Sequence, residues 1–409
     1  MESLRVLHLH DKPHGGGGIR AHVELAEQAL TDIGVTVKAM QIASTRRGRS
    51  NPHLLPRTYW RAEGWIWQSE YLRSITEFAP DVVHVHAGFT ALAAPLLRLL
   101  SRHWPVVASF HDVAPFCPRG DRLYMGGTEL CNVIAGFDCL RSGCWRSPDI
   151  AGRVRNSLHR ATQKNLMMGW FGFDELVFPS RYLLGLALQH GASESRCSVV
   201  PHCVSIDLPQ PMQRTGIPQI LFVGQISEAK GADLVLSALP FLGDLPYSMI
   251  FLGDGPQRSV FEQRVRTLGL QDRVSFKGWC SPDVVRQFRQ QSILSLFTSR
   301  VAESFGLSGL ESLAASRPVI GIARAGAAEW LIDGVTGIDV GLHSPELIGS
   351  AISRLILDRD LAEKLGRTGF DMVNREYRPS HYGAHMLERY RSAIERAERR
   401  SERVPCVAG

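Results

Sequence analysis

The chain has 409 residues, of which 44% are hydrophobic and 21% are charged, so it is long enough for two domains and is not extensively disordered. Its formal net charge of +6 favours anionic partners without choosing between nucleic acid, lipid headgroups and phosphorylated small molecules. No run approaches the ~20 apolar residues of a transmembrane helix, and the first residues lack a signal-peptide core, so we expect a cytoplasmic protein.

Short apolar strands alternate with helical patterns over the first half of the chain. Strands are predicted at residues 4–10, 35–42, 81–87 and 105–112, and helices at 20–34 and 91–103. This alternation predicts a parallel sheet with helices on both faces. Polar residues gather directly after the strands, at 14–18, 86–88 and 111–112, which is the sheet edge where α/β proteins bind ligands.

A second series of strands and helices follows a proline-rich linker. We predict strands at 219–225, 248–256, 274–279, 292–297, 318–323 and 336–340, with helices within 231–242 and 258–270 and a charged amphipathic helix at 381–403. The prediction is an α/β fold of two facing, doubly wound Rossmann-like domains with a cleft between them. Its parts are an N-terminal domain at 1–208 with a cysteine-containing insertion at 112–146, the linker at 209–218, a C-terminal domain at 219–375, and a C-terminal helix within 376–409 that packs back on the first domain.

Two glutamates, Glu303 and Glu311, stand eight positions apart around small and apolar residues. If a helix starts near Phe305, Glu303 lies in the loop before it and Glu311 about two turns on. Free amides at a helix start bind anions, so the segment suits a ligand with a diphosphate between two sets of hydroxyls, such as a sugar nucleotide. In the alternative interpretation, Glu303 caps the helix and Glu311 faces solvent.

Five motifs follow one another along the chain: SFHD at 109–112, FVGQISEAKG at 222–231, LGDGP at 252–256, ESFGLSGLE at 303–311 and AAEWLIDGVTG at 327–337. In this order they resemble the motifs of the retaining glycosyltransferases with the GT-B fold that form family 4. The resemblance covers nearly the whole chain. It implies a transferase whose donor is a nucleoside-diphosphate sugar.

The resemblance implies roles for the matching residues. The implied catalytic residues are Glu303, which stabilises positive charge at the reacting carbon, His111, which reaches the donor sugar, and Lys230, which pairs with the diphosphate. A lysine in a glycine-flanked loop after a strand also suits a leaving phosphate on physical grounds. Glu311 would hold the ribose. The other implied donor contacts are Gly16, Gly17, Gln225, Gly253, Ser304, Phe305, Gly306 and Leu307.

The glycine run at 15–18 fits neither of two common nucleotide motifs. It lacks the G-K-[ST] ending of a P-loop, and Arg20 occupies the last position of G-x-G-x-x-G, which disfavours triphosphate hydrolysis and dinucleotide redox chemistry. Arg20 is a candidate for contact with the phosphate or the acceptor, and Arg119 and Arg122 are candidates for contact with the acceptor.

Several positions depart from the family pattern. Gln225 stands where an arginine is usual, so Lys230 would carry more of the diphosphate charge. His202 and Cys203 replace Asn and Gly, and Ala325 and Ala328 replace Gly and Pro. None of these departures touches Glu303, Glu311 or Lys230, so they bear on the identity of the donor more than on the activity.

No divalent metal or other cofactor is expected for catalysis. The only D-x-D pattern, at 358–360, lies in a charged helical stretch and is interpreted as a solvated face. A zinc site remains an alternative for Cys117, Cys131, Cys139 and Cys144, although their spacings contain no C-x-x-C; free thiols in an acceptor-side loop are the other interpretation.

The predicted function is transfer of a sugar, with retention, to an acceptor hydroxyl. The expected acceptor is a carbohydrate or a lipid-linked saccharide of cell-envelope or exopolysaccharide assembly, with a small natural-product aglycone as the second choice. The arginine-rich stretch around 46–61 allows peripheral contact with an anionic membrane. The rivals are a sugar-nucleotide epimerase, a non-catalytic sugar-nucleotide-binding subunit and a nucleic-acid-binding protein; nucleic acid is not expected as a partner because no basic-aromatic recognition face is evident.

Overall fold

Two parallel six-stranded sheets organise the chain, one in each of two units. The computed structural model describes residues 3–11, 18–42, 73–86, 94–117, 119–124, 127–135, 139, 144, 172–206, 208, 210–212, 215–342 and 344–402. The first unit comprises residues 1–127, 131–201 and 379–409, and the second comprises 128–130 and 202–378. The chain therefore crosses between units after Pro201, a few residues before the predicted linker, and crosses back at Pro379.

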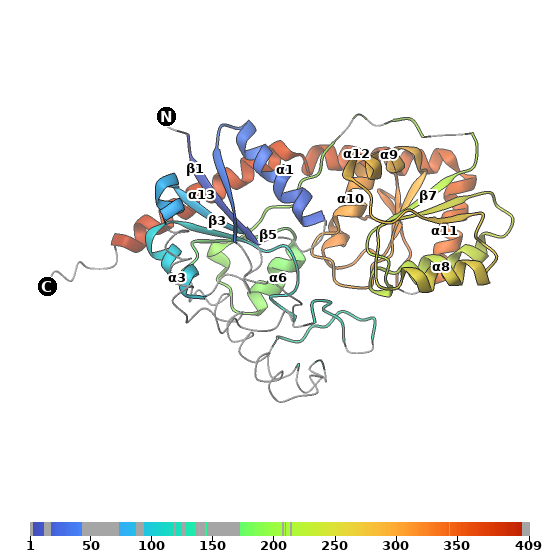
Figure 1. Ribbon diagram of the computed structural model, residues 1–409, viewed down its shortest axis with the longest axis horizontal. Coiled ribbons are helices and arrows are strands. Elements are labelled where there is room, and N and C mark those ends of the chain that lie inside the picture. The colour runs from blue at the N-terminus through green and yellow to red at the C-terminus, as the bar shows by residue number, and fades with distance from the viewer. Residues whose placement is uncertain are drawn as a thin grey trace. The chain divides into compact units, whose positions relative to one another are not determined.

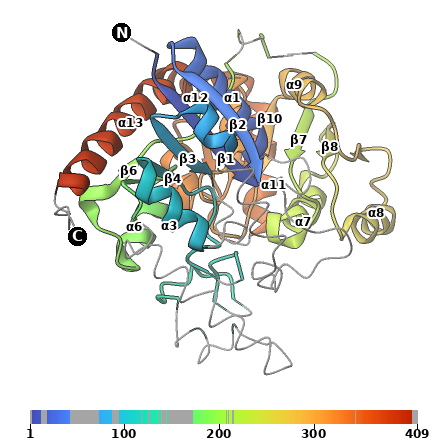
Figure 2. The same cartoon turned by 60° about the vertical axis from the view of Figure 1, so that its left-hand side comes forward.

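The first sheet has the strand order β2-β1-β3-β4-β5-β6, and all its strands are parallel. Its strands are β1 (Arg5–Asp11), β2 (Thr36–Ile42), β3 (Val82–His86), β4 (Val106–Ser109), β5 (Glu175–Phe178) and β6 (Cys197–Val199). The helices are α1 (Gly18–Asp32), α3 (Ala94–His103), α6 (Arg181–Gln189) and α13 (Pro379–Glu402). Helices α1 and α13 lie side by side along this sheet (Figures 1 and 2).

The second sheet has the order β12-β11-β10-β7-β8-β9 and is also parallel. Its strands are β7 (Gln219–Val223), β8 (Ser248–Leu252), β9 (Val274–Phe276), β10 (Leu294–Phe297), β11 (Val319–Gly321) and β12 (Gly337–Asp339). The helices are α7 (Ala232–Ala238), α8 (Arg258–Thr267), α9 (Pro282–Gln291), α10 (Leu307–Ala314), α11 (Pro345–Leu357) and α12 (Arg359–Glu376). The predicted doubly wound α/β fold is confirmed.

The strand order reverses once in each sheet, between β1 and β3 in the first and between β7 and β10 in the second. At such a point the connections leave the two neighbouring strands in opposite directions, and a crevice opens at their carboxyl ends. The loops that carry Lys230 and Glu303 follow β7 and β10. The histidines of β1 and β3 flank the corresponding point of the first sheet.

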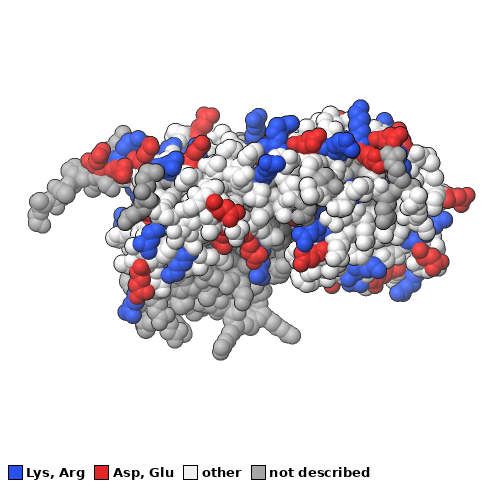
Figure 3. All heavy atoms as spheres, turned by 90° about the horizontal axis from the view of Figure 1, so that it is seen from above, with Lys and Arg blue, Asp and Glu red and all other residues white. Residues whose placement is uncertain are grey.

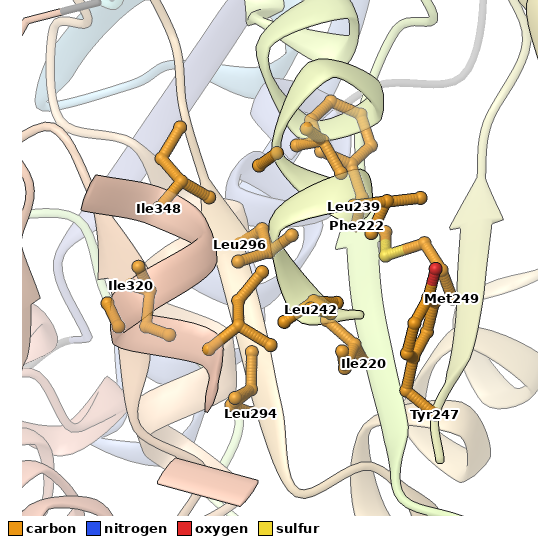
Figure 4. Close-up of a cluster of buried hydrophobic side chains, with 14 of the residues drawn as sticks. Ile220, Phe222, Leu239, Leu242, Tyr247, Met249, Leu294, Leu296, Ile320 and Ile348 are labelled. Atoms are coloured by element: carbon orange, nitrogen blue, oxygen red, sulfur yellow. The ribbon is translucent and has the colours of Figure 1, made fainter. Parts of the chain in front are cut away.

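The second sheet is buried on both faces, which explains the nearly continuous apolar sequence of its strands. Along β7, Ile220 and Phe222 join one core cluster with Leu294 and Leu296 of β10, whereas Leu221 faces a second cluster. Figure 4 shows the first cluster meeting Ile348 of α11. Each fully buried aliphatic side chain contributes about 1.5–3 kcal/mol, so this packing holds β7 and β10 firmly beneath their loops.

The surface charges and the helices can be compared with the expected contact between the protein and a membrane. On the face seen in Figure 3, basic and acidic side chains are interspersed. Among the residues that the structure describes, no helix combines the length and the apolar character needed to cross a bilayer. The arginine-rich stretch at 46–61, on which the expected membrane contact rests, lies outside the described residues.

Candidate active site

Lys230 and Glu303 meet at the carboxyl ends of the two central strands of the second sheet. The ammonium of Lys230 donates to Glu303 Oε1 at 2.5 Å, and the hydroxyl of Ser299 donates to the same oxygen at 2.6 Å. The side chains of Lys230 and Glu303 are 35% and 17% exposed, so both are reachable by a ligand. The structure thus brings together the lysine that was predicted to pair with the diphosphate and the glutamate that was predicted to stabilise positive charge at the reacting carbon.

A salt bridge joins the loop that carries Lys230 to the loop that carries Glu303; the sequence motifs did not predict it. The guanidinium of Arg300 donates to both carboxylate oxygens of Asp233, at 2.5 and 2.6 Å, and to the carbonyl oxygen of Glu228 at 2.5 Å. The amide of Arg300 also donates to the carbonyl oxygen of Ala229 at 2.9 Å. Arg300 therefore ties the loop of Lys230 to the loop of Glu303.

We expect Arg300→Lys to lower the free energy of unfolding by about 1–3 kcal/mol, because lysine cannot reproduce a planar bidentate contact with Asp233. Denaturant unfolding measures the change. Arg286→Lys is the matched control, since Arg286 pairs with Asp283 within one exposed helix. Equal effects of the two substitutions would contradict a special role for Arg300.

Gly231 allows the close approach of these loops. Its φ of +74° is favourable only for glycine, and a Cβ at this position would lie 2.0 Å from the carbonyl oxygen of Thr298. The hydroxyl of Thr298 donates to the carbonyl oxygen of Gly231 at 3.0 Å. The glycine that follows Lys230 thus seats the lysine loop directly on the end of β10.

Helix α10 begins at Leu307, two residues later than predicted, with Gly306 before it at a φ of +88°. Glu303 lies in the preceding loop, and Glu311 lies in the helix, where it accepts a hydrogen bond from Arg289. The side chain of Phe305 is fully buried against His202 and Tyr377, so only its backbone is placed to contact a donor.

The turn Ala325–Glu329 supports the loop of Glu303 from the neighbouring strand. The amide of Gly326 donates to the carbonyl oxygen of Glu303 at 2.9 Å. The indole of Trp330 donates to the carbonyl oxygen of Phe305 at 2.6 Å, and its ring packs on Gly309. These contacts hold the backbone of the ESFGLSGLE segment and were not foreseen from the sequence.

Ala325, which stands where the family usually has glycine, has a strained backbone conformation. Ala325 has a φ of +51°, which costs a residue with a Cβ about 1–2 kcal/mol. We therefore expect Ala325→Gly to raise the free energy of unfolding by about 1 kcal/mol, since relief of strain outweighs the added freedom of the unfolded chain. Thermal unfolding checks this, with Ala328→Gly as the control, and a lower melting temperature for Ala325→Gly would contradict it.

In the first unit, His111 follows β4 and is 3% exposed. Its Nε2 lies 3.0 Å from Nδ1 of His86. Burial lowers the pKa of His111 to about 4, so its ring is neutral at physiological pH. His111 is therefore suited to hydrogen bonding with a sugar hydroxyl and not to pairing with a phosphate.

The remaining residues that were predicted to contact the donor lie in several different loops. Gly16 and Gly17 lie outside the described residues. Gln225 is exposed in the loop after β7, and the amide of Gly253 donates to the carbonyl oxygen of Gly278 at the end of β8. Ser304 lies beside Phe305 in the loop before α10. The neighbouring departure Cys203 is 1% exposed, and burial raises the pKa of its thiol to about 12, so it is unreactive.

The three arginines proposed for the acceptor or phosphate are all engaged. Arg20 pairs with Glu24 on the exposed side of α1, and Arg119 pairs with Asp121. Arg122 is 1% exposed and donates to the carbonyl oxygens of Phe116 and Val133. This burial favours a structural role for Arg122 over the expected contact with an acceptor.

Cys117, Cys131, Cys139 and Cys144 carry free thiols. None of the four belongs to a group of three or more closely spaced metal-ligating atoms within the part of the chain that the structure describes. In the first unit such a group is formed by His8, His84 and His86. The predicted D-x-D pattern lies at the start of α12, where the carboxylate of Asp358 caps the helix by accepting from the amide of Leu361.

Two family models match the chain. The model described as Glycosyltransferase Family 4 matches residues 16–208, and the model described as Glycosyl transferases group 1 matches residues 208–372. The chain belongs to this family of glycosyltransferases. The second match contains Lys230, Glu303 and Glu311, and the first contains His111.

Two relatives illustrate the range of this glycosyltransferase family. The chain is 32% identical over 320 residues to a D-inositol 3-phosphate glycosyltransferase of Acidothermus cellulolyticus, an alignment that covers 70% of this chain and 62% of that protein. It is 29% identical over 337 residues to an alpha-D-kanosaminyltransferase of Streptomyces kanamyceticus, which covers 81% and 82%. The chain thus spans less than two thirds of the first relative.

Solved structures share the two-domain GT-B architecture. The structure of Anabaena HepE in complex with UDP-glucose has a TM-score of 0.68 at 15% identity, and the match covers 95% of this chain and all of that one. A glycosyltransferase from Rickettsia africae gives a TM-score of 0.70 at 15% identity, with 97% and 100% covered. At this identity the likeness establishes the fold alone, and it confirms the predicted GT-B class.

Proposed function

We propose that the protein is a retaining glycosyltransferase that moves a sugar from a nucleoside-diphosphate sugar to an acceptor hydroxyl. The observation that carries the proposal is the pair of Lys230 and Glu303 at the reversal point of the second sheet, next to the start of α10. A partly exposed cation, a helix start and a carboxylate in this arrangement suit a leaving diphosphate and the positively charged carbon that it leaves behind.

The proposed reaction needs stabilisation that grows as charge develops. As the bond between the anomeric carbon and the phosphate oxygen breaks, negative charge collects on the diphosphate, where the Lys230 ammonium and the first amides of α10 would bind it. Glu303, held by Ser299 when Lys230 turns to the diphosphate, would face the carbon. The acceptor oxygen bonds to that carbon on the same face, and its proton passes to the departing phosphate oxygen.

Glu311 is proposed to hold the ribose hydroxyls. Its partner Arg289 has a side chain that is only 9% exposed, whereas the side chain of Glu311 is 32% exposed. The arginine therefore orients the carboxylate from the protein side and leaves part of it to a ligand. Neutral His111 would contact a hydroxyl of the donor sugar.

The acceptor is proposed by class. Transfer to a lipid-linked saccharide of the cell envelope or to another glycoconjugate is our first choice, with no divalent metal required for the reaction. Transfer to a small aglycone is the second choice, and it is favoured by the similarity over most of both chains to an alpha-D-kanosaminyltransferase. Peripheral contact with the inner face of the membrane remains part of the first choice.

The test begins with the donor. A thermal-shift series with UDP-, GDP-, ADP- and dTDP-sugars should give one nucleotide that raises the melting temperature, because a ligand that binds only the folded state stabilises it. The labelled donor is then incubated with acceptor mixtures, and NMR of the product reports the anomeric configuration. An inverted linkage would overturn the retaining mechanism. An epimer formed without acceptor would favour an epimerase, and binding without turnover would favour a non-catalytic subunit.

A further inference from the structure

A chain of hydrogen bonds runs behind His111 in the first unit. We call it the histidine chain; it consists of Glu27, His8, His86 and His111, with a side branch through Tyr390, His84 and Ser109. The four histidines are at most 3% exposed. The reaction proposed above uses only the last of them.

Strand geometry explains why the histidines meet. Side chains two positions apart point to the same face of a strand, so His84 and His86 share one face of β3. His8 of β1 is the direct neighbour of His84 in the parallel register. Helices α1 and α13 bring Glu27 and Tyr390 to this face. The histidine side chains of the first sheet therefore lie together at β1 and β3, where the strand order reverses.

The distances define the connections. His86 Nδ1 lies 3.0 Å from His111 Nε2, and His86 Nε2 lies 3.3 Å from His8 Nδ1. His8 Nδ1 also lies 3.3 Å from Glu27 Oε1. In the branch, the hydroxyl of Tyr390 lies 3.2 Å from His8 Nε2 and 2.8 Å from His84 Nδ1, and His84 Nε2 lies 2.7 Å from the hydroxyl of Ser109.

A neutral imidazole has one donor and one acceptor nitrogen, so a chain of them can point in only two directions. In one direction His8 Nδ1 carries a hydrogen; in the other it carries a lone pair. Glu27 decides between them, because a carboxylate only accepts, and a lone pair facing it at 3.3 Å would be repelled. His8 therefore donates from Nδ1, towards Glu27 and His86.

The remaining rings follow from this choice. His86 accepts at Nε2 and must then carry its hydrogen on Nδ1, from which it donates to Nε2 of His111. In the branch, Tyr390 donates to Nε2 of His8, His84 Nδ1 donates to Tyr390, and Ser109 donates to Nε2 of His84. Each linked nitrogen thus has a partner of the correct kind while all four rings are neutral, in keeping with the lowered pKa values that burial causes for His8, His84, His86 and His111. The ring nitrogens of His8, His84 and His86 are satisfied in this way without a metal.

We propose that Glu27, acting through His8 and His86, fixes His111 as the tautomer with its hydrogen on Nδ1. His86 is then a positioning residue that orients His111, and the Nδ1–H of His111 is a hydrogen-bond donor of the kind that a hydroxyl oxygen of the donor sugar can accept. The contact between His111 and the donor sugar rests on the proposed function, whereas the tautomer of His111 does not.

The decisive experiment is NMR of the full chain labelled with 15N-histidine, because long-range proton–nitrogen correlations distinguish the two tautomers. His111 is assigned by the signal lost in His111→Asn. In the unsubstituted protein at pH 7 we expect hydrogen on Nδ1 of His111 and of His86. Hydrogen on Nε2 of His111 in the unsubstituted protein would overturn the proposal.

The direction of the chain is tested by Glu27→Gln, whose amide donates as well as accepts and so permits the reverse arrangement. We expect the Nε2–H form of His111 to appear in this variant. Glu24→Gln is the matched control, since Glu24 lies on the same helix and pairs with exposed Arg20. An unchanged His111 signal in Glu27→Gln, or the same change in Glu24→Gln, would overturn the assignment to Glu27.

Activity provides a separate arm. In His86→Asn the side-chain amide places a donor near the position of Nδ1, whereas His86→Leu has none. We expect kcat for sugar transfer to fall about tenfold in His86→Leu, with donor KM nearly unchanged, and to be largely restored in His86→Asn. Equal losses in the two variants would contradict the positioning role. If the unsubstituted protein transfers no sugar, the proposed function fails, while the NMR result still decides the tautomer.

Discussion

Glu303→Gln should lower the rate of sugar transfer by about 10²–10³-fold while the protein stays folded. The substitution keeps the shape of the side chain and one acceptor for Ser299 but removes the negative charge. That charge is proposed to act only once the anomeric carbon becomes positive, so its loss raises the barrier and leaves donor binding nearly intact. Steady-state kinetics with the donor found by thermal shift measure the change in kcat.

Glu311→Gln is the informative comparison. Because Glu311 is assigned to the ribose, we expect donor KM to rise about tenfold and kcat to change little. The stability of Glu303→Gln should be close to that of the unsubstituted protein, since its partner Lys230 is partly exposed and water can solvate the ammonium. Turnover by Glu303→Gln at the original rate would refute the role given to Glu303.

Acid should destabilise the first unit more steeply than its surface charges explain. Burial lowers the folded-state pKa values of His8, His84, His86 and His111, the last to about 4. Below pH 6.5 these histidines bind protons in the unfolded chain but stay neutral in the folded chain. The free energy of unfolding therefore falls as the pH falls. Each such histidine contributes up to about 1.4 kcal/mol per pH unit between the unfolded-state pKa and its folded-state pKa.

The measurement compares slopes, because other groups also titrate. Burial raises the pKa values of Asp174 and Glu175 in the same unit, and their contribution has the opposite sign. Denaturant unfolding between pH 5 and 6.5 should therefore be run on His84→Asn beside the unsubstituted protein. We expect the variant's slope to be smaller by about 1 kcal/mol per pH unit, averaged over this range. His103→Asn is the control, because His103 is an exposed residue of α3, and identical slopes for all three proteins would contradict the prediction.

Local patterns were sufficient for many of the elements and for the order of the motifs, although they did not predict α9 and α11. The alternation at 81–87 and the apolar run at 219–225 predicted β3 and β7 because side-chain period and β-propensity are properties of a few adjacent residues. The glutamate spacing at 303–311 predicted one acid before α10 and one within it, with an error of two residues in the helix start. Helix ends depend on capping contacts such as that of Gly306, which the apolar pattern does not record.

Contacts between distant residues were decided by the tertiary structure. Asp233 and Arg300 are separated by 67 positions and His84 and Tyr390 by 306, so neither pair leaves a periodic signal. The histidines at spacing two in β1 and β3 were visible, but only the neighbouring register of these strands and the return of α13 make them a chain. The sequence by itself determined which residues could carry charge and hydrogen bonds at the strand ends. Which of them meet depended on the packing of the whole chain, because strand order is set by burial over the entire sheet and not by any local segment.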